Sequence, residues 1–497
     1  MNNFLPFLPL GLIVIFAISV MLLEVTLTKN KEILAYVSLV GIAFSTISTV
    51  TLWKSQPEGF RFSFFDEMFV VDNFSMFFYV LFLLCAGICI FTSVGYLKRE
   101  NIEHGEYYSL VLFAVTGMML MASGGDLLVL FLGLEIMSIS IYVLVGFRRR
   151  DLKSNEAILK YFFLGAFSAG FILYGIALIY GTTGTTSLLH IKDSLASAGA
   201  FNSAKLSMIG VLMILVGVLF KVAAVPFHVW VPDVYEGAPA PVTGFMISAV
   251  KAASFALFLK LFLVSFIDLR DSWKDIIVII SVITMFAGNI FAFTQDNIKR
   301  MLAYSSISHT GYLLIGIASL TNSPGNQSAN AILYYLVAYS VSSLGIFACI
   351  SFLSQKGEEF VNTDDYAGIG FKYPLIGITM SIFMFSLMGV PPTGGFFAKY
   401  YLFTGALNQG MYVLVLIGLV NSMLSIYYYL RVIAVMYLKE SSFTITNDMG
   451  KFSTNIVIVY TAIGTLWLGI GTFTLFSVIP GAFSIIEWSK ASIQSLF

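Results

Sequence analysis

The stretch KVAAVPFHVWVPDVYEGAPAPV, from Lys221 to Val242, decides the fold of this chain. It follows directly on an apolar run that begins near residue 206, so a lysine stands late in a segment long enough to cross a bilayer. Pro226 then interrupts the helix, because its nitrogen has no hydrogen to donate and its ring clashes with the preceding turn. A broken apolar helix that carries a lysine is typical of the ion pathway of a membrane transporter.

The composition of the whole chain indicates the same class. Of its 497 residues, 58% are hydrophobic and only 11% are charged, whereas about a quarter are charged in a typical soluble domain. A soluble fold could not cover so much apolar surface, but a bilayer core about 30 Å thick can. The net charge of zero argues against nucleic acid as a partner. We therefore expect an all-α integral membrane protein.

Apolar runs of transmembrane length follow one another along the chain. There are fourteen of them, near residues 5–24, 33–53, 73–97, 107–123, 126–146, 157–180, 206–225, 243–266, 275–294, 300–320, 329–354, 374–404, 410–437 and 454–478. They are too long for the strands of a membrane barrel, and a helix satisfies its own backbone groups in lipid. The pattern predicts about 14 transmembrane helices.

Lysine and arginine are shared unevenly between the two sets of loops, and this bias predicts the orientation. With the N-terminus outside, fourteen of them fall on the inner side: Lys29, Lys31, Lys98, Arg99, Arg148, Arg149, Arg150, Lys153, Lys299, Arg300, Lys356, Lys372, Lys439 and Lys451. Seven fall on the outer side: Lys54, Arg61, Lys192, Lys205, Arg270, Lys274 and Lys490. We therefore expect a multi-pass protein of the bacterial inner membrane with both termini on the outer side.

The runs divide the chain into four parts. Residues 1–106 hold helices 1–3, 107–266 hold helices 4–8, 275–437 hold helices 9–13, and 454–497 hold helix 14. Each central part has five helices, an odd number, so the second would be an inverted repeat of the first. Proline interrupts the fourth helix of each part, at Val225-Pro226 in helix 7 and at Val390-Pro391-Pro392 in helix 12. Paired broken helices in inverted repeats mark the binding site of many transporters.

Charged residues lie deep within several runs, where a charge costs about 2.5–3.5 kcal/mol on insertion scales. Glu135 lies about 13 Å and Lys251 about 12 Å into their helices, at a rise of about 1.5 Å per residue. Lys221 precedes the break in helix 7, and Lys399 follows the break in helix 12. The competing interpretations are a protonated structural acid for Glu135 and snorkelling to the interface for the lysines. Their depth favours a functional role.

Other titratable residues leave more room for a structural explanation. Lys160 is four residues from Glu156, so a local pair and a pathway role are both open. Lys260 lies near a helix end and is expected to snorkel. His228 follows the helix 7 break and His309 lies about 13 Å into helix 10; histidine titrates near neutral pH, but a lone buried histidine is often a satisfied core residue.

These residue types permit a proton relay. Burial favours the neutral form of a lysine, whereas a nearby carboxylate favours its charged form. Glu135 near Lys221 would therefore form a pair whose separation sets the proton occupancy of the next lysine. The sequence has no glycine-rich nucleotide loop, cysteine cluster or bis-histidine span, and so gives no sign of a redox centre or a metal site.

Four segments resemble the antiporter-like proton-pumping subunits shared by respiratory complex I and the multisubunit cation/proton antiporters. They are Lys221–Val242 quoted above, NIKRMLAYSSISHTGY at Asn297–Tyr312, SLMGVPPTGGFFAKYYLF at Ser386–Phe403, and LFLGLEIMSISIYVLVGF at Leu130–Phe147. Within that superfamily the chain most resembles the subunit N family of NADH–quinone oxidoreductase. The sequence DVYEGAPAP is typical of subunit N. Residue 399 is a lysine, whereas subunit M has a glutamate at that place.

The resemblance implies a fold of fourteen helices with two inverted five-helix repeats. It implies that Glu135 and Lys221 form a coupling pair, that Lys251 is the central relay and that Lys399 is the far-side proton group. It places Lys160, His228 and His309 at accessory positions of the pathway. NADH, flavin, iron–sulfur clusters and quinone would be bound by other membrane or peripheral subunits of the complex, and no cofactor by this chain. The implied function is proton translocation coupled to quinone reduction.

Two other functions remain open at this stage. A subunit of a multisubunit sodium/proton antiporter would carry similar core segments, although the segment after the helix 7 break favours complex I. A structural membrane subunit without conduction is a further alternative, against which the number of deep charges on broken helices argues.

Overall fold

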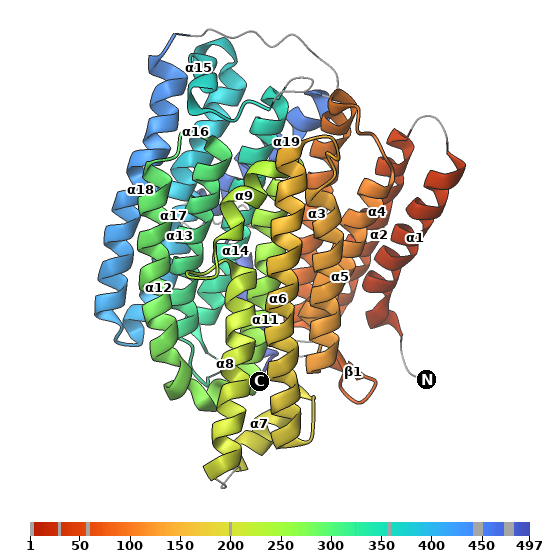
Figure 1. The fold of residues 1–497 in the computed structure, drawn as a ribbon, viewed down its shortest axis with the longest axis vertical. Coiled ribbons are helices and arrows are strands. Elements are labelled where there is room, and N and C mark those ends of the chain that lie inside the picture. The colour runs from red at the N-terminus through yellow and green to blue at the C-terminus, as the bar shows by residue number, and fades with distance from the viewer. Residues whose placement is uncertain are drawn as a thin grey trace.

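Long apolar helices lie side by side and run mostly along the long axis of the molecule (Figure 1). The computed structural model describes residues 4–27, 31–55, 60–197, 201–323, 325–354, 359–440, 451–471 and 482–497. Within these ranges, twelve helices are long and apolar enough to cross a membrane. The prediction of an all-α membrane protein is confirmed.

The N-terminal part consists of three helices and a hairpin. A 3-10 turn at Leu5–Phe7 leads into α1 (Leu8–Thr26), followed by α2 (Glu32–Ser55) and α3 (Asn73–Glu100). The antiparallel strands β1 (Arg61–Phe64) and β2 (Phe69–Asp72) precede α3, and Asp72 caps that helix by accepting from the backbone N–H of Ser75. The apolar runs did not predict this hairpin, because it is short and lies between two helices.

The first central part contains one more helix than the apolar runs predict. Its helices are α4 (Glu106–Ser123), α5 (Leu127–Val145), α6 (Leu152–Thr183), α7 (Leu188–Ser197), α8 (Phe201–Val222), α9 (Trp230–Gly237) and a long helix at Ala240–Ser265. The short polar α7 was not predicted, and α9 is the continuation of helix 7 beyond its break. The long helix is α10 (Ala240–Phe245) and α11 (Lys251–Leu259), with π-helical turns at Met246–Val250 (η2) and Lys260–Ser265 (η3).

The second central part also contains a helix that is interrupted at prolines. After a 3-10 turn at Ile267–Leu269 come α12 (Arg270–Phe293), α13 (Ile298–Ala318), α14 (Gln327–Leu353), the 3-10 turn η5 (Thr363–Tyr366), α15 (Ile369–Lys372), α16 (Pro374–Met388), α17 (Gly394–Asn408) and α18 (Tyr412–Leu438). The chain then forms α19 (Lys451–Ile470) and α20 (Ala482–Gln494). The predicted run 454–478 extends beyond Gly471 into residues outside the described ranges.

Some of the predicted organisation remains a prediction. The long described helices coincide with the predicted runs, whereas α7 and α20 lie outside them, and α13 is too polar and α16 too short to count among the twelve candidate spans. The number of fourteen spans, the inverted repeats and the borders of the four parts are therefore still expectations. Both chain ends lie at the hairpin end of the bundle: Phe7 packs on Phe69, and Ser495 Oγ accepts from the N–H of Phe74 at 3.2 Å. The side of the membrane that this end faces stays a prediction.

The helix Ala240–Ser265 and α14 are the most deeply buried of the candidate spans. The most apolar window of Ala240–Ser265 is fully buried and that of α14 is 94% buried, whereas α6 is 39% buried. The outer helices instead expose large apolar side chains such as Phe163, Phe167 and Val413, which a bilayer would cover.

Glycines allow two corresponding pairs of helices to approach closely. In α4 and α5, a Cβ added at Gly117 would lie 2.4 Å from the backbone nitrogen of Met137 and 2.5 Å from the carbonyl oxygen of Gly133. In α12 and α13, a Cβ added at Gly288 would lie 2.5 Å from the backbone nitrogen of Ser308. Small residues are what let transmembrane helices pack backbone against backbone.

We expect Gly117→Ala and Gly288→Ala each to destabilise the protein by about 1–3 kcal/mol, because the added methyl group must push two backbones apart. Gly170→Ala on α6 is the matched control, since a Cβ there meets nothing within 4 Å. The measurement is the melting temperature of the detergent-solubilised protein. Equal melting temperatures for all three variants would contradict this account of the packing.

Candidate functional site

The two proline breaks have the same backbone geometry. The structure places them between α8 and α9 and between α16 and α17, as predicted. At the first break, Ala223 is left-handed (φ 65°) and the N–H of Ala224 donates to Leu219 O at 2.9 Å. At the second, Gly389 is left-handed (φ 91°) and the N–H of Val390 donates to Phe385 O at 2.9 Å. Both helices therefore end in a Schellman motif.

Each proline leaves a carbonyl oxygen that a side chain satisfies. Pro226 has no N–H for the carbonyl of Val222, four residues earlier, and Thr310 Oγ1 donates to that oxygen at 2.6 Å. Pro392 likewise has no N–H for the carbonyl of Met388, and Lys399 Nζ donates to it at 2.9 Å. An unsatisfied carbonyl in an apolar interior costs about 1–3 kcal/mol. The breaks therefore fix the positions of a threonine and a lysine.

Lys251 is buried at the start of α11, and its amine is hydrogen-bonded to α13. Its Nζ donates to Ser306 O at 2.6 Å, to Ser306 Oγ, and to Thr310 Oγ1 at 3.0 Å. Thr310 thus accepts from Lys251 and donates to Val222 O. One hydroxyl group connects this lysine to the helix end that carries Lys221.

Aromatic rings and His309 fill the space between Lys251 and Lys399. Lys251 Nζ lies 5.5 Å from the centre of the Tyr339 ring, whose centre is 4.7 Å from that of His309. The His309 ring is in turn 5.7 Å from that of Tyr312, and Lys399 Nζ lies 5.0 Å from the centre of the Tyr312 ring. The two lysines face opposite ends of one row of buried groups.

His309 is fully hydrogen-bonded through both ring nitrogens. Nδ1 lies 2.6 Å from Tyr335 Oη and Nε2 lies 3.2 Å from Tyr429 Oη. Tyr429 in turn bonds Ser305. The histidine is therefore both a satisfied core residue and a member of a hydroxyl network, so the two interpretations of its sequence position are compatible.

Glu135 and Lys221 lie near one another but form no ion pair within 4.0 Å. Lys221 Nζ donates to Ser138 Oγ at 2.9 Å, and Ser138 follows Glu135 by three residues on α5. Oε1 of Glu135 is buried without a hydrogen-bond partner. Lys221 is therefore hydrogen-bonded to a residue one helical turn from Glu135 and not to Glu135 itself.

The remaining candidates are only partly brought together. Lys160 bonds both Glu156 at 2.6 Å and Asp233 of α9 at 2.5 Å, so the local pair and the contact with the broken helix coexist. Nδ1 of His228 is buried without a partner, and no hydrogen bond of the described residues joins it to a predicted lysine. The snorkelling expectation for Lys260 is wrong: it is 3% exposed and donates to Gly124 O at 2.9 Å.

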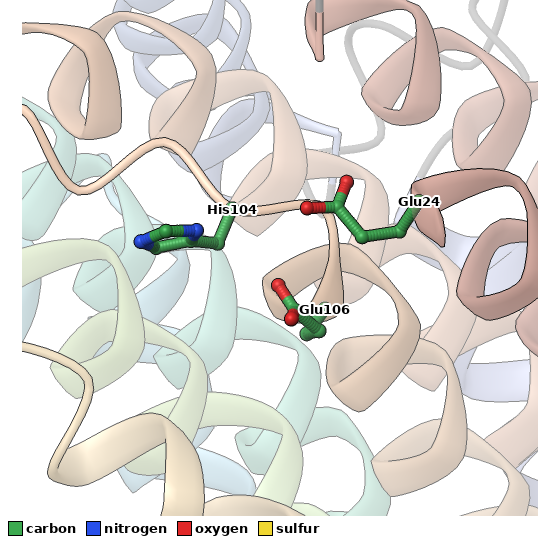
Figure 2. A group of neighbouring side chains, drawn as sticks. All are labelled: Glu24, His104 and Glu106. Carbon is green, nitrogen blue, oxygen red and sulfur yellow. The ribbon is translucent and has the colours of Figure 1, made fainter. Parts of the chain in front are cut away.

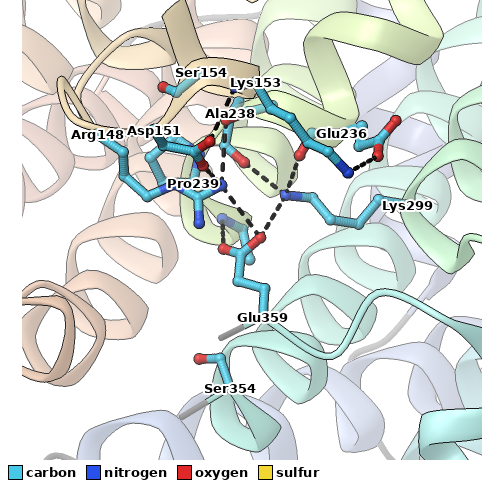
Figure 3. A network of polar contacts seen from close by, with 12 residues as sticks. Arg148, Asp151, Lys153, Ser154, Glu236, Ala238, Pro239, Lys299, Ser354 and Glu359 are labelled. Carbon is cyan, nitrogen blue, oxygen red and sulfur yellow. Dashed lines mark hydrogen bonds and ion pairs between the residues drawn. The ribbon is translucent and has the colours of Figure 1, made fainter. Parts of the chain in front are cut away.

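A buried ion-pair network at the opposite end from the hairpin was not predicted (Figure 3). Lys299 Nζ donates to Glu359 Oε2 at 2.8 Å, and Arg148 lies 3.5 Å from the same carboxylate. Burial would raise the pKa of Glu359, but Lys299 and Arg148 lower it to about 2, so the group is ionised at neutral pH. No sequence pattern pointed to this network, because Lys299 counted as a loop charge and Glu359 lies between helices.

A group of potential metal ligands lies at the same end, on α1, α4 and the turn between α3 and α4 (Figure 2). Ligand atoms of Glu24, His104 and Glu106 all lie within 4.8 Å of one another. His104 and Glu106 are exposed, and Lys31 already forms an ion pair with Glu24. We assign no metal site to this group.

Comparisons with known proteins identify the family of this chain. The family profile "NADH:quinone oxidoreductase/Mrp antiporter, TM" matches residues 124–425, and "NADH-ubiquinone oxidoreductase chain 4, amino terminus" matches residues 12–122. NADH-quinone oxidoreductase subunit N of Trichlorobacter lovleyi is 48% identical over 445 residues, which are 89% of each chain. Subunit N 1 of Koribacter versatilis is 41% identical over 99% of this chain and 96% of its own.

This chain belongs to the NADH-quinone oxidoreductase subunit N family. Among solved structures, a chain of respiratory complex I from Thermus thermophilus with bound aureothin superposes with a TM-score of 0.78 at 32% identity, covering 93% of this chain and 97% of that one. A chain of the Mrp complex from Dietzia has a TM-score of 0.85 at 20% identity, covering 100% and 97%, which shows a shared fold. The subunit N family and the fold of this membrane subunit were therefore both predictable from the sequence.

In this subunit N homologue, we expect Gly389→Ala to displace Lys399 from the carbonyl oxygen of Met388, because an added Cβ would lie 3.1 Å from Lys399 Cδ. Gly410→Ala is the control: it is left-handed too (φ 74°) but meets nothing within 4 Å. Both variants should lose about 1–2 kcal/mol of stability from backbone strain. Electron cryo-microscopy should show the bond between Lys399 and Met388 O broken only in Gly389→Ala. An intact bond in that variant would mean that the lysine adapts.

Proposed function

We propose that this chain conducts protons through the bilayer as an antiporter-like membrane subunit of a proton-pumping NADH-quinone oxidoreductase. The observation that carries this proposal is the row of buried groups joining Lys221, Lys251 and Lys399 at two broken helices. These three lysines are buried and form no ion pair with any residue that the structure describes, which is expensive in an apolar interior, so a functional role is the default explanation. Hydroxyl groups and a histidine lie between them.

The central step is a change in the protonation of Lys251. The ammonium form of Lys251 has three N–H donors, and α13 offers it three acceptors: Ser306 O, Ser306 Oγ and Thr310 Oγ1. When Lys251 gives up a proton, the Thr310 hydroxyl can rotate, because it accepts from the lysine and donates to Val222 O. The orientation of the Thr310 hydroxyl therefore depends both on the charge of Lys251 and on the Val222 carbonyl at the helix break.

Glu135 and Lys221 would set when that step occurs. The carboxylate favours the charged form of Lys221, and more strongly at shorter separation. A rearrangement that brings the pair closer would keep the proton on Lys221, and one that separates it would release the proton toward Lys251. The hydrogen bond of Lys221 to Ser138, which is one helical turn from Glu135, supports this proposal. It gives the amine a second partner close to the carboxylate.

Lys399 would release the proton on the far side. His309, between the two lysines, can accept a proton at one nitrogen while losing one from the other, with Tyr335 and Tyr429 as partners. A charge that moves across 100 mV gains or loses about 2.3 kcal/mol, so a continuous open water path would waste the gradient. A lysine seated on a carbonyl oxygen can block the path when charged and pass a proton when neutral.

The other parts of the proposal concern partners and location. The relatives are named as subunits of an enzyme complex, and we assign NADH, flavin, iron–sulfur clusters and quinone to its other subunits, with no redox centre in this chain. Its partners would be the other complex I membrane subunits, the lipid bilayer and protons. We place it in the bacterial inner membrane with both termini outside. Lys160 and His228 would be accessory groups on the inner side of the pathway.

A sodium/proton antiporter subunit is the competing function, because the Mrp chain shares the fold. Inverted vesicles that contain this chain distinguish the two. NADH-driven acidification that does not depend on sodium supports the proposal. A pH change driven by added sodium without NADH would replace it with antiport.

We expect Thr310→Val to reduce the proton pumping rate by about tenfold or more, because the isosteric side chain lacks the hydroxyl that links Lys251 to Val222 O. Thr310→Ser keeps the hydroxyl and should keep most of the rate. Pumping is measured in inverted vesicles and normalised to assembled complex. Equal rates for the valine and serine variants would remove Thr310 from the relay.

We expect Lys399→Arg to assemble normally but pump poorly, because arginine does not deprotonate in this pH range. Lys399→Glu should keep partial activity, since it still titrates. The measurement is the number of protons pumped per electron. Wild-type pumping by Lys399→Arg would show that a fixed positive charge is sufficient and that Lys399 is not the release group.

A further inference from the structure

The junction between α9 and α10 is held by charges that come from outside both helices. Three successive carbonyl groups end α9 and its following turn: Glu236 O and Ala238 O accept from Lys299 Nζ at 2.9 and 2.6 Å, and Gly237 O accepts from Arg148 at 3.3 Å. The C-terminal end of a helix carries a partial negative charge, so cations there are stabilising. Figure 3 shows Lys299 among these oxygens.

The start of the next helix has the opposite charge beside it. Ala240 is the first residue of the long helix Ala240–Ser265, and its N–H donates to Glu359 Oε1 at 3.2 Å. The other oxygen of the same carboxylate bonds Lys299 at 2.8 Å. An anion at a helix N-terminus complements the unsatisfied N–H groups there. One buried ion pair therefore caps both helix ends at once.

The same pair connects this junction to the helix on which Lys251 is seated. Lys299 stands at the beginning of α13, and Ser306 and Thr310 follow on that helix. Lys251 stands eleven residues after Ala240 in the long helix. The long helix is thus attached to α13 at two levels, about 10 Å apart along α13, first at the capping pair and then at Lys251.

We propose that Glu359 and Lys299 are positioning residues for Lys251. They hold the α9–α10 junction on α13 and so set the register between the long helix, which carries Lys251, and α13, which carries its hydrogen-bond acceptors. This rests on the proposed function. Neither residue contacts the relay itself. Glu359 is 4% exposed in its side chain and Lys299 is fully buried, so water cannot replace either partner.

The test compares variants in purified, assembled complex. Glu359→Gln keeps an acceptor for Ala240 N–H but loses the charge, and Lys299→Met keeps the length but loses the donors. Lys299→Arg is the conservative variant, because it retains both charge and donors. Asp364→Asn is the matched control: Asp364 lies in η5, five residues after Glu359, and bonds Lys439 in an exposed pair at 2.6 Å. Lys251→Met serves as the reference for loss of the relay.

Two readouts separate positioning from simple support. Glu359→Gln and Lys299→Met should lower the protons pumped per electron by about twofold or more while NADH-driven quinone reduction continues. Deuterium exchange in a peptide covering residues 238–253 should become faster in both. Lys299→Arg should restore both readouts, and Asp364→Asn should leave both at the wild-type value.

Different results would contradict the positioning role and the relay. Wild-type stoichiometry and exchange in the assembled Glu359→Gln and Lys299→Met complexes would overturn the positioning role, as would a loss confined to the amount of assembled complex. Wild-type pumping by Lys251→Met would overturn the proposed relay instead. In that case the exchange measurement still decides whether the pair holds the long helix on α13.

Discussion

A carbonyl oxygen without a hydrogen-bond partner is the constraint on which this structure depends most. In a bilayer no water can reach the backbone, so every interruption of a helix must be compensated by protein. Two prolines create such oxygens at Val222 and Met388, and the groups that satisfy them are Thr310 and Lys399. The need to complete the backbone and the positions of Thr310 and Lys399 therefore have one physical origin.

The same constraint acts at the α9–α10 junction, with a different solution. There the orphaned groups are several and lie at two helix ends, and an ion pair of Lys299 and Glu359 satisfies both. Charged caps are stronger than neutral ones, and removing one partner leaves an uncompensated charge. A hydroxyl group and an amine complete the two breaks, whereas paired charges complete the junction.

The sequence was sufficient for what depends on local composition. Apolar runs predicted the described helices to within a few residues at most ends, and Pro226 and Pro392 marked both breaks, because proline acts on its own turn. The contacts of Lys221 with Ser138 and of Lys251 with Ser306 could not be predicted, since they join residues far apart in the chain. Lys260 shows that the position of a residue in an apolar run does not predict its burial. It stands near the end of its run, but other elements cover it in the structure. Glu359 and Thr310 had no signal at all, because a loop glutamate and a helix threonine are common in any membrane protein.

The π-helical turn at Met246–Val250 lies directly before Lys251. A π turn holds one residue more than an α turn, and it shifts the direction of everything that follows by about 100° relative to an unbroken α-helix. The direction in which Lys251 points is therefore set by a single extra residue in the preceding turn. If this turn relaxed to α-helical geometry, the amine would swing away from Ser306 and Thr310 without any change in its own backbone angles. The π turn thus sets the rotational position of Lys251 toward Ser306 and Thr310 in a helix that is buried on all sides.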